Sequence, residues 1–508
     1  MAHLTILPIL LPLLAAIVLL LVPTRRIAIH RFVGLLSCAG LVVVAATLAL
    51  QADDGGTRVY LVGNWAAELG IALAADRLSA IMLLATSLLA LPCLWFATGG
   101  WDRRALHFHV LFQFQLMGLN GAFLTADLFN LFVFFEVLLI ASYGLLLSGA
   151  RGARVRSGLH YVAFNITAST LYLFAVGYIY GITGALNMAE VAVRVAAMPA
   201  AEAAPLKAAA GLLLVVFCAK AALLPMYFWL PETYARSPAA VAALFAVMTK
   251  LGVYTVLRVF TLVFGAEAGE LANLAWPWLL PLGAATLVLA TLGALAAPSI
   301  RLLAAYLVLG SAATLFIALG LASAEALGAG LYYLLHSTLV GGALFLLADL
   351  IRRNRDNAGD SLRKLDHMKH RTLLGLMFFV AAVSVAGLPP LSGFVGKFSL
   401  LAAVPDAQAG WIWPVILGTS LLVLVALASA ASQLFWREGG EPAAPGAIPR
   451  LRVSEVGATV ALLVMGLLLS LFGGPVLRYT QDAGAQLVAP AAYIDAVRGA
   501  VPKPGVEP

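Results

Sequence analysis

The sequence predicts an all-α polytopic membrane protein with about 14 transmembrane helices and no separate soluble domain. Two observations lead to this prediction. The 508 residues are 62% hydrophobic and 11% charged, with a mean hydropathy of +0.99, which is outside the range of soluble domains. An α-helix rises 1.5 Å per residue, so about 20 apolar residues cross a bilayer, and runs of that length follow one another along most of the chain.

The apolar runs divide the chain into 14 expected spans. The first run has no basic leader and is followed by Arg25 and Arg26, so we interpret it as a retained span rather than a signal peptide. We expect residues 1–475 to form one transmembrane domain and residues 476–508 an extracytoplasmic tail. The spans are expected at 4–22, 32–51, 77–98, 106–125, 128–148, 159–181, 206–230, 238–263, 274–297, 301–322, 326–351, 372–403, 411–436 and 454–474.

The basic residues predict the orientation. Of the 31 Lys and Arg residues, 20 fall in the loops after odd-numbered spans, seven on the other side and four within spans. Positive loops stay in the cytoplasm, so both termini are expected to be extracytoplasmic, in the inner membrane of a bacterium. The same bias accounts for the net charge of +7 without a nucleic-acid partner.

Two shorter segments outside the spans have recognisable patterns. Residues 57–62 and 72–74 predict a small extracytoplasmic hairpin. Residues 186–197 are typical of a short amphipathic helix lying on the membrane surface.

Four expected spans each carry one ionisable residue that cannot easily reach water, and His336 is a candidate fifth; the four are Glu136, Lys220, Lys250 and Lys397. Lys250 is near the middle of its span, too far from either end for its side chain to reach the headgroups. A central Lys opposes insertion by ~3 kcal/mol, and intramembrane charges usually mark ion or proton paths. We therefore expect these residues to form a polar axis through the protein.

Two spans are expected to be broken near this axis. Pro225 removes a helical hydrogen bond just after Lys220, and Gly387, Pro389 and Pro390 interrupt the helix before Lys397. Freed carbonyls at membrane depth persist only where they are buried in protein or face water.

The breaks also suggest a repeat. Each falls in the fourth span of a five-span unit, the first unit covering about 106–263 and the second about 274–436. Five is an odd number, so the second unit must be inverted relative to the first.

Proton relay is the chemistry that these residue types allow. Movement of Glu136 toward or away from Lys220 would change the proton affinity of the lysine, and the proton would then pass through water to Lys250 and by way of His336 to Lys397. The structural alternatives are an ion pair between Glu136 and Lys220 that locks two helices, and an interhelical hydrogen bond at His336.

Other charged residues near span ends are expected to be structural. We expect Arg258 and Asp349 to be interfacial or snorkelling groups. Asp127 and Glu232 lie at span ends, where they could mark entrances to the polar axis, but we interpret them as solvated helix caps.

The chain resembles the antiporter-like proton-translocating subunits shared by respiratory complex I and multisubunit cation/proton antiporters. Within that superfamily it is most similar to the D subunits of the Mrp-type (Mnh, Pha) antiporters, which residues 184–192 and 490–498 favour over the complex I relatives. The resemblance covers nearly the whole chain. The segments that carry it are residues 127–147, 184–192, 230–258, 387–397 and 490–498.

The resemblance implies specific roles. The family's key Glu falls on Glu136, its three lysines on Lys220, Lys250 and Lys397, and the His of its central axis on His336. One departure is Ser237 before Pro238, where the family pattern has a double proline. The resemblance also implies partner subunits in a hetero-oligomer.

Two classes of function follow. The first is a proton-translocating subunit of a monovalent cation/proton antiporter, with sodium as the expected cation. The second is a proton-pumping membrane subunit of a redox complex of the complex I or membrane-hydrogenase type. A purely structural scaffold is disfavoured by the number of intramembrane charges.

No cofactor or metal is expected in this chain. Cys38, Cys93 and Cys218 lie inside spans without metal-type spacing, and the sequence has no haem or dinucleotide motif. The chain itself is thus expected to carry out no redox reaction and to be a transporter subunit rather than an enzyme.

Overall fold

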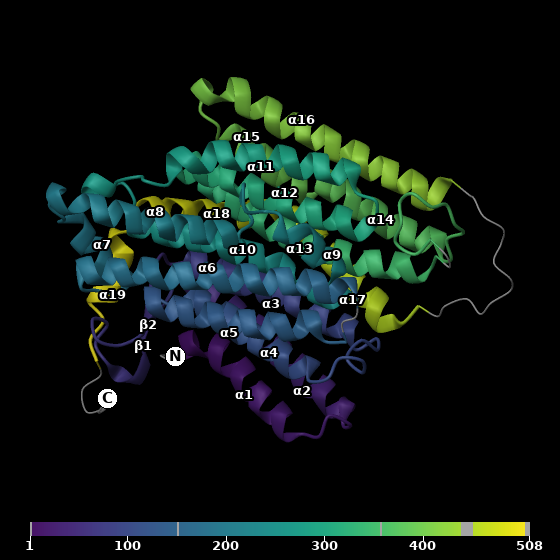
Figure 1. The fold of residues 1–508 in the computed structure, drawn as a ribbon, viewed down its shortest axis with the longest axis horizontal. Helices are drawn as coiled ribbons and strands as arrows, with labels where there is room; N and C mark the ends of the chain where they lie inside the picture. The colour runs from purple at the N-terminus through teal and green to yellow at the C-terminus, as the bar shows by residue number, and fades with distance from the viewer. Residues whose placement is uncertain (1–2, 150–151, 356–357, 438–450, 503–508) are drawn as a thin grey trace.

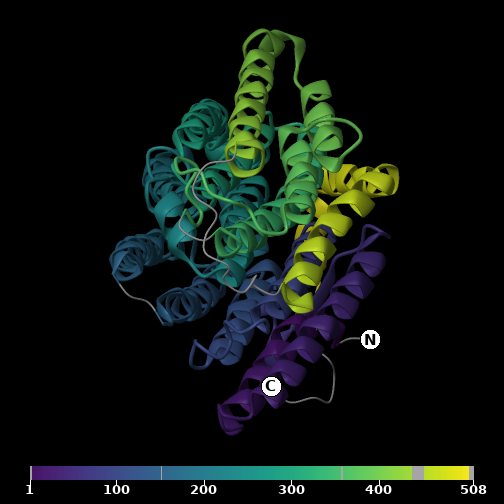
Figure 2. The same cartoon turned by 90° about the vertical axis from the view of Figure 1, so that its right-hand side faces the viewer.

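The computed structural model describes residues 3–149, 152–355, 358–437 and 451–502. Arg151, Arg450 and Lys503, which contribute to the charge counts above, and the last residues of the expected tail lie outside the described residues. The chain forms a bundle whose long helices run in roughly one direction (Figure 1), and Figure 2 shows the bundle from one end. Within the described part, 12 helices are long and apolar enough to cross a membrane.

The first half of the bundle ends with α10. Its helices are α1 (Leu7–Leu21), α2 (Ile27–Ala52), α3 (Arg77–Ala97), α4 (Phe108–Leu124), α5 (Leu128–Leu147), α6 (Ala153–Thr183), α7 (Met188–Ala196), α8 (Ala203–Lys220), α9 (Trp229–Arg236) and α10 (Ala239–Leu262).

The second half begins with α11. Its helices are α11 (Trp276–Ala296), α12 (Ile300–Gly320), α13 (Ala324–Arg353), α14 (Arg371–Ala386), α15 (Ser392–Ala402), α16 (Asp406–Ala431), α17 (Val453–Leu471), α18 (Gly473–Val488) and α19 (Ala491–Arg498). An all-α membrane fold is confirmed. Two of the 14 expected spans are not among the 12 long helices: 106–125 forms the 17-residue α4, and 372–403 forms α14 and α15 with a break between them.

The expected hairpin is present. Strand β1 (Arg58–Leu61) pairs antiparallel with β2 (Ala72–Ala75), and the register places Arg58 opposite Ala75. His3 contacts Tyr60 of β1, and α19 also packs near this strand. The first and last described segments therefore lie at the same end of the bundle (Figure 1).

Basic side chains from several helix ends and loops gather at the other end of the bundle. Arg31, Arg104, Arg154, Arg301 and Arg452, which belong to five separate segments, line one cavity there. The loops after odd-numbered spans thus share one end, called the arginine-rich end below.

Helix α10 lies at the centre of the bundle. Its apolar membrane-spanning stretch is completely buried inside the protein, and it packs against α3, α8, α12 and α13. Gly252 allows a close contact with the end of α8, because a Cβ atom there would lie 2.6 Å from the backbone nitrogen of Ala221. This contact sets α10 directly against the residue that follows Lys220.

Helices α17 and α18 together lie antiparallel to α13. At one end Arg353 pairs with Glu455. Further along, the Tyr332 hydroxyl donates to the Leu469 carbonyl, and Gly484 lies against the Ala324 carbonyl. The start of the segment that we expected as a tail, α18, is therefore packed on the N-terminal part of α13.

Candidate functional site

The first helix break ends α8 at Lys220. Ala222 takes a positive φ of 61°, and the Leu224–Pro225 peptide bond is cis. At the end of α8 the Ala219 carbonyl accepts from the backbone N–H of Ala222 and from the indole N–H of Trp229, the latter at 3.0 Å. The predicted break at Pro225 is confirmed, and it leaves Lys220 as the last residue of a half-helix inside the bundle.

Lys220 and Glu136 are neighbours without an ion pair. The Lys220 ammonium donates to the Ser169 hydroxyl at 3.3 Å and lies 5.2 Å from the centre of the Phe135 ring. Glu136 acts on it electrostatically, yet no salt bridge within 4.0 Å joins the two among the described residues. One Glu136 carboxylate oxygen is buried without a hydrogen-bond partner in that part of the chain. The locking ion pair, our structural alternative, is absent from this conformation.

Lys250 is completely buried, with 0% exposure. Its ammonium donates to the Ser311 hydroxyl of α12 at 2.6 Å, and that hydroxyl in turn donates to the Val308 carbonyl. A charged ammonium can donate three hydrogen bonds, so this contact leaves capacity for water or another carrier.

The second break separates α14 from α15. Gly387 has a φ of +79°, a conformation that favours glycine, and the Pro389–Pro390 bond is cis. The break predicted at Pro389 and Pro390 is confirmed. The broken span α14–α15 crosses the bundle in the direction opposite to the broken span α8–α9, because α14 starts and α9 ends near the arginine-rich end (Figure 1).

Lys397 folds back onto its own break. Its ammonium donates to the carbonyls of Val385 and Ala386, at 3.2 and 3.1 Å, and to the Ser420 hydroxyl of α16 at 3.0 Å. The lysine therefore satisfies the carbonyls that the end of α14 leaves free.

His336 interacts electrostatically with both Lys250 and Lys397. Its Nδ1 is 2.9 Å from the Ser392 hydroxyl at the start of α15. Gly393 makes this approach possible, because a Cβ there would lie 1.9 Å from the Ser384 carbonyl and 2.9 Å from His336 Nε2.

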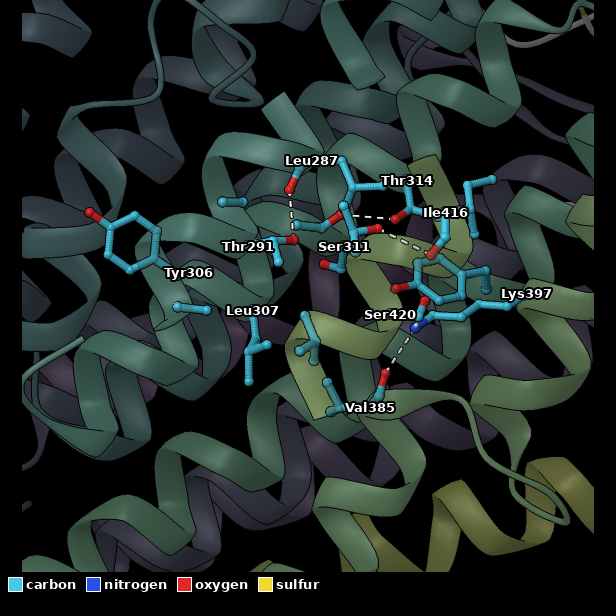
Figure 3. A pocket seen from close by; sticks show the side chains of 16 residues that line it. Leu287, Thr291, Tyr306, Leu307, Ser311, Thr314, Val385, Lys397, Ile416 and Ser420 are labelled. Carbon is cyan, nitrogen blue, oxygen red and sulfur yellow. Dashed lines mark hydrogen bonds between the residues drawn. The ribbon is translucent and has the colours of Figure 1, made fainter. Parts of the chain in front are cut away.

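Two small cavities lie beside these groups, and Ser311 lines both. One, of about 40 Å³, is lined by Ser311, Lys397 and Ser420 (Figure 3). The other, of about 20 Å³, is lined by Ser311 and His336. A polar cavity of ~10–15 Å³ can hold one water, so each has room for a water molecule between the polar side chains.

Each basic group of the axis contacts a serine from another helix. The sequence analysis missed these serines, because single serines are common in apolar spans and their partners are far away in the chain. A hydroxyl can accept one hydrogen bond while it donates another, so these contacts suit a relay. The pairs are Lys220 with Ser169, Lys250 with Ser311, His336 with Ser392, and Lys397 with Ser420.

The structure brings the five predicted residues into two groups. Glu136 and Lys220 form the first group, and Lys250, His336 and Lys397 form the second. No contact between Lys220 and Lys250 is recorded among the described residues, although Gly252 holds their helices together.

Arg258 was wrongly predicted to snorkel. Only 3% of it is exposed, and its two terminal nitrogens donate to the two oxygens of Asp76 at 2.7 and 2.6 Å. The rings of Tyr254 and Tyr493 lie against the guanidinium. Burial alone would raise the pKa of the Asp76 carboxyl, but the charge and hydrogen bonds of Arg258 lower it below the ordinary value.

The other structural predictions have mixed outcomes. Asp127 caps α5 by accepting from the backbone N–H of Asn130; it is only 9% exposed, and burial raises the pKa of its carboxyl. Glu232 forms an exposed pair with Arg236, as expected of a solvated group. Asp349 pairs with Arg352 near the arginine-rich end.

The two sequence segments that favour the Mrp-type resemblance contact each other. Residues 188–196 form α7, and residues 491–498 form α19. Glu190 of α7 pairs with Arg498 of α19 at 2.9 Å and with Arg194 of its own helix. Burial of the Glu190 carboxyl tends to raise its pKa, but the two arginines lower it below the ordinary value.

Comparison with known proteins gives a consistent group of relatives. Residues 125–424 match the family model described as NADH:quinone oxidoreductase/Mrp antiporter, TM. The chain is 40% identical to the probable K(+)/H(+) antiporter D subunit of Rhizobium meliloti (strain 1021), with 98% of each chain covered. It is 36% identical to the Na(+)/H(+) antiporter D subunit of Alkalihalophilus pseudofirmus, covering 98% of this chain and 99% of that one.

A solved structure agrees with these matches. A chain of the Mrp complex from Dietzia sp. DQ12-45-1b superposes with a TM-score of 0.86 at 29% identity, covering 98% of this chain and 99% of that chain.

Proposed function

This chain belongs to the NADH:quinone oxidoreductase/Mrp antiporter family, and from that premise we propose that it is the proton-translocating subunit of a multisubunit monovalent cation/proton antiporter. Relatives named as D subunits of antiporters, similar over almost their whole length, support this proposal over the redox-pump class. Sodium is the cation that we expect. The R. meliloti relative is named for potassium, which makes potassium the second cation to test.

The observation that carries the proposal is the environment of Lys250. A fully buried ammonium on the central helix lowers the stability of the protein, so its presence there indicates a function. Its partner Ser311 lines both water-sized cavities, and these reach His336 on one side and Lys397 on the other. A proton held at Lys250 therefore has hydroxyl groups and space for water on its way to the second break.

We propose that Glu136 and Lys220 act as the switch of the relay. When the Glu136 carboxylate is near, it stabilises the protonated form of Lys220. When the carboxylate moves away, Lys220 releases its proton more easily. The missing ion pair leaves the two groups free to change their separation. From Lys220 the proton would pass to Lys250, through His336 or the water cavities, and on to Lys397.

The proposed orientation places the arginine-rich end in the cytoplasm of a bacterium, with the hairpin and α19 outside the inner membrane. The positive loops support this orientation. Protons would enter down their gradient while the cation leaves. Other subunits of the antiporter would complete the path, as members of a hetero-oligomeric complex in the lipid bilayer.

Cation-dependent proton flux tests the proposal. We would express the whole gene cluster in an antiporter-deficient host and compare the native chain with Lys250→Met in everted vesicles. We expect sodium-dependent flux in the native complex and its loss in an assembled, normally abundant variant. The matched control is Lys207→Met, which removes an exposed lysine that pairs with Glu270 and should leave the flux unchanged.

Two results would contradict the proposal. Full flux in Lys250→Met would remove Lys250 from the proton path. Pumping linked to respiration, without a response to sodium or potassium, would move the chain to the redox-driven class.

A further inference from the structure

The arginine-rich end contains a cavity that the proton relay does not use. Its volume is about 620 Å³, within the range of ~300–1,000 Å³ that is typical of small-molecule sites. Segments from α2, α3, α6, α10, α12, α13 and α17 surround it. Eight arginines and two acidic residues, Asp349 and Glu455, line it.

Four of these arginines have carboxylate partners. Arg31 pairs with Asp102, and Arg301 pairs with Asp360. Arg352 and Arg353 share Asp349, and Arg353 also reaches Glu455. These contacts account for every carboxylate that lines the cavity.

The other four arginines have no carboxylate partner within the described part of the chain. They are Arg103, Arg104, Arg154 and Arg452. Arg154 donates to a backbone carbonyl and lies over the Trp101 ring. The charges of Arg301 and Arg352 also repel it. About four positive charges therefore line the cavity without a carboxylate partner, and a bound anion would offset their mutual repulsion.

The backbone of α10 adds to this field. Ser237, Pro238, Ala239 and Ala240 line the cavity, and Pro238, the N-cap residue, makes no side-chain cap. The first N–H groups and the positive end of the helix dipole therefore lie at the cavity. The same field repels cations, so this cavity does not suit the transported sodium or potassium ion.

We propose that this cavity binds a phosphate-bearing anion with at least two negative charges. Arginine favours phosphate over chloride because the planar guanidinium donates two parallel hydrogen bonds to two phosphate oxygens. The phosphate comes either from a free phosphoester or from the headgroup of an anionic lipid. The proposal does not depend on proton transport, and its test reads binding rather than flux.

The test uses the purified, assembled complex. In the first arm, inorganic pyrophosphate is titrated calorimetrically at low ionic strength. In the second, the complex is reconstituted in vesicles of equal parts phosphatidylcholine and phosphatidylglycerol and re-extracted, and the retained phosphatidylglycerol is measured by mass spectrometry. Binding in the first arm alone identifies a free phosphoester, and retention in the second alone identifies a lipid headgroup.

The variants remove two arginines that have no carboxylate partner. We expect Arg103→Gln with Arg452→Gln to weaken binding by about ten-fold or more, and added salt to weaken native binding. The control, Arg58→Gln with Arg478→Gln, removes two charges far from the cavity and should bind as the native complex does. If the glutamine variant does not assemble, Arg103→Lys with Arg452→Lys keeps the charge, loses the paired donors and should bind more weakly.

Two outcomes would overturn the proposal. One is that the native complex binds neither probe. The other is that the cavity variants and the control bind with the affinity of the native complex.

Discussion

Two pairs of opposite charge inside the bundle differ in how closely their charged groups approach each other. Asp76 and Arg258 contact each other through two short hydrogen bonds and are enclosed by tyrosines. Glu136 and Lys220 interact at longer range: the Lys220 ammonium donates to Ser169, and one Glu136 carboxylate oxygen is buried without a hydrogen-bond partner among the described residues.

The difference in distance separates a pair that holds two helices together from a pair that can change the proton affinity of a lysine. A bidentate pair fixes both side chains, and breaking it leaves an uncompensated buried charge. A loose pair changes its interaction energy whenever a side chain moves, because the Coulomb energy depends on distance and dielectric. We infer that Asp76 and Arg258 hold α3 against α10, and that Glu136 and Lys220 are the pair able to move a proton.

The largest expected effect is on stability. Asp76→Asn should destabilise the folded chain by about 3–5 kcal/mol, because Arg258 would remain charged and buried without its partner. Thermal unfolding of the purified complex and its abundance in the membrane measure this. The surviving complexes should keep their flux. Asp54→Asn, at an exposed pair with Arg58, should change stability by less than about 1 kcal/mol.

The next effect is on transport alone. Glu136→Gln removes the charge that acts on Lys220 while keeping the shape, so cation-dependent flux should fall by about 100-fold at normal abundance. Flux in everted vesicles, divided by the amount of complex, measures this. Glu232→Gln is the matched control. A Glu136→Gln variant that unfolds like Asp76→Asn would make the two pairs equivalent and contradict the comparison.

A smaller effect is expected at the serine beside Lys220. Ser169→Ala removes one hydrogen bond to the ammonium, worth about 1 kcal/mol, and should change flux by about five-fold. Thr167→Val on the same helix, whose hydroxyl donates to the Ala163 carbonyl, should have no effect on flux. Equal flux losses in the two variants would indicate damage to α6 rather than to the relay.

The smallest effect concerns a pair near the surface. The pKa of Glu190 is held below its ordinary value near 4.5, so the ionised carboxylate stabilises the docking of α19 above that pH, and this contribution is lost as the pH falls through the lowered value. Limited proteolysis should find α19 protected at neutral pH and more easily cleaved in strong acid. Arg498→Gln should be cleaved more easily at neutral pH, with little change in the acid.

Sequence patterns predicted the parts of the site that are unusual for a membrane. Lysines inside spans and prolines next to them are rare enough to indicate the axis and both breaks. The carboxylate partner of Arg258 could not be predicted in the same way, because Asp76 precedes a span and is typical of a helix cap. It does cap α3, accepting from the Ser79 N–H, and it pairs with Arg258 as well.

The packing of α18 was missed for a different reason. Its contact with α13 depends on glycines, with Gly328 against the backbone of Gln481 and Gly484 against the Ala324 carbonyl. Close contact between backbones needs small residues rather than a long apolar run. The hydropathy pattern therefore contains no signal for it.

The central position of α10 has a consequence for the order of assembly during synthesis. When α10 leaves the ribosome, Asp76 has already been made, whereas Ser311, the partner of Lys250, follows 61 residues later. We expect Arg258 to find its carboxylate first and to retain α10 beside α3. Lys250 would then wait, unpartnered, until α12 and α13 enclose it, so the pair of Asp76 and Arg258 would guide the insertion of the helix that carries the relay.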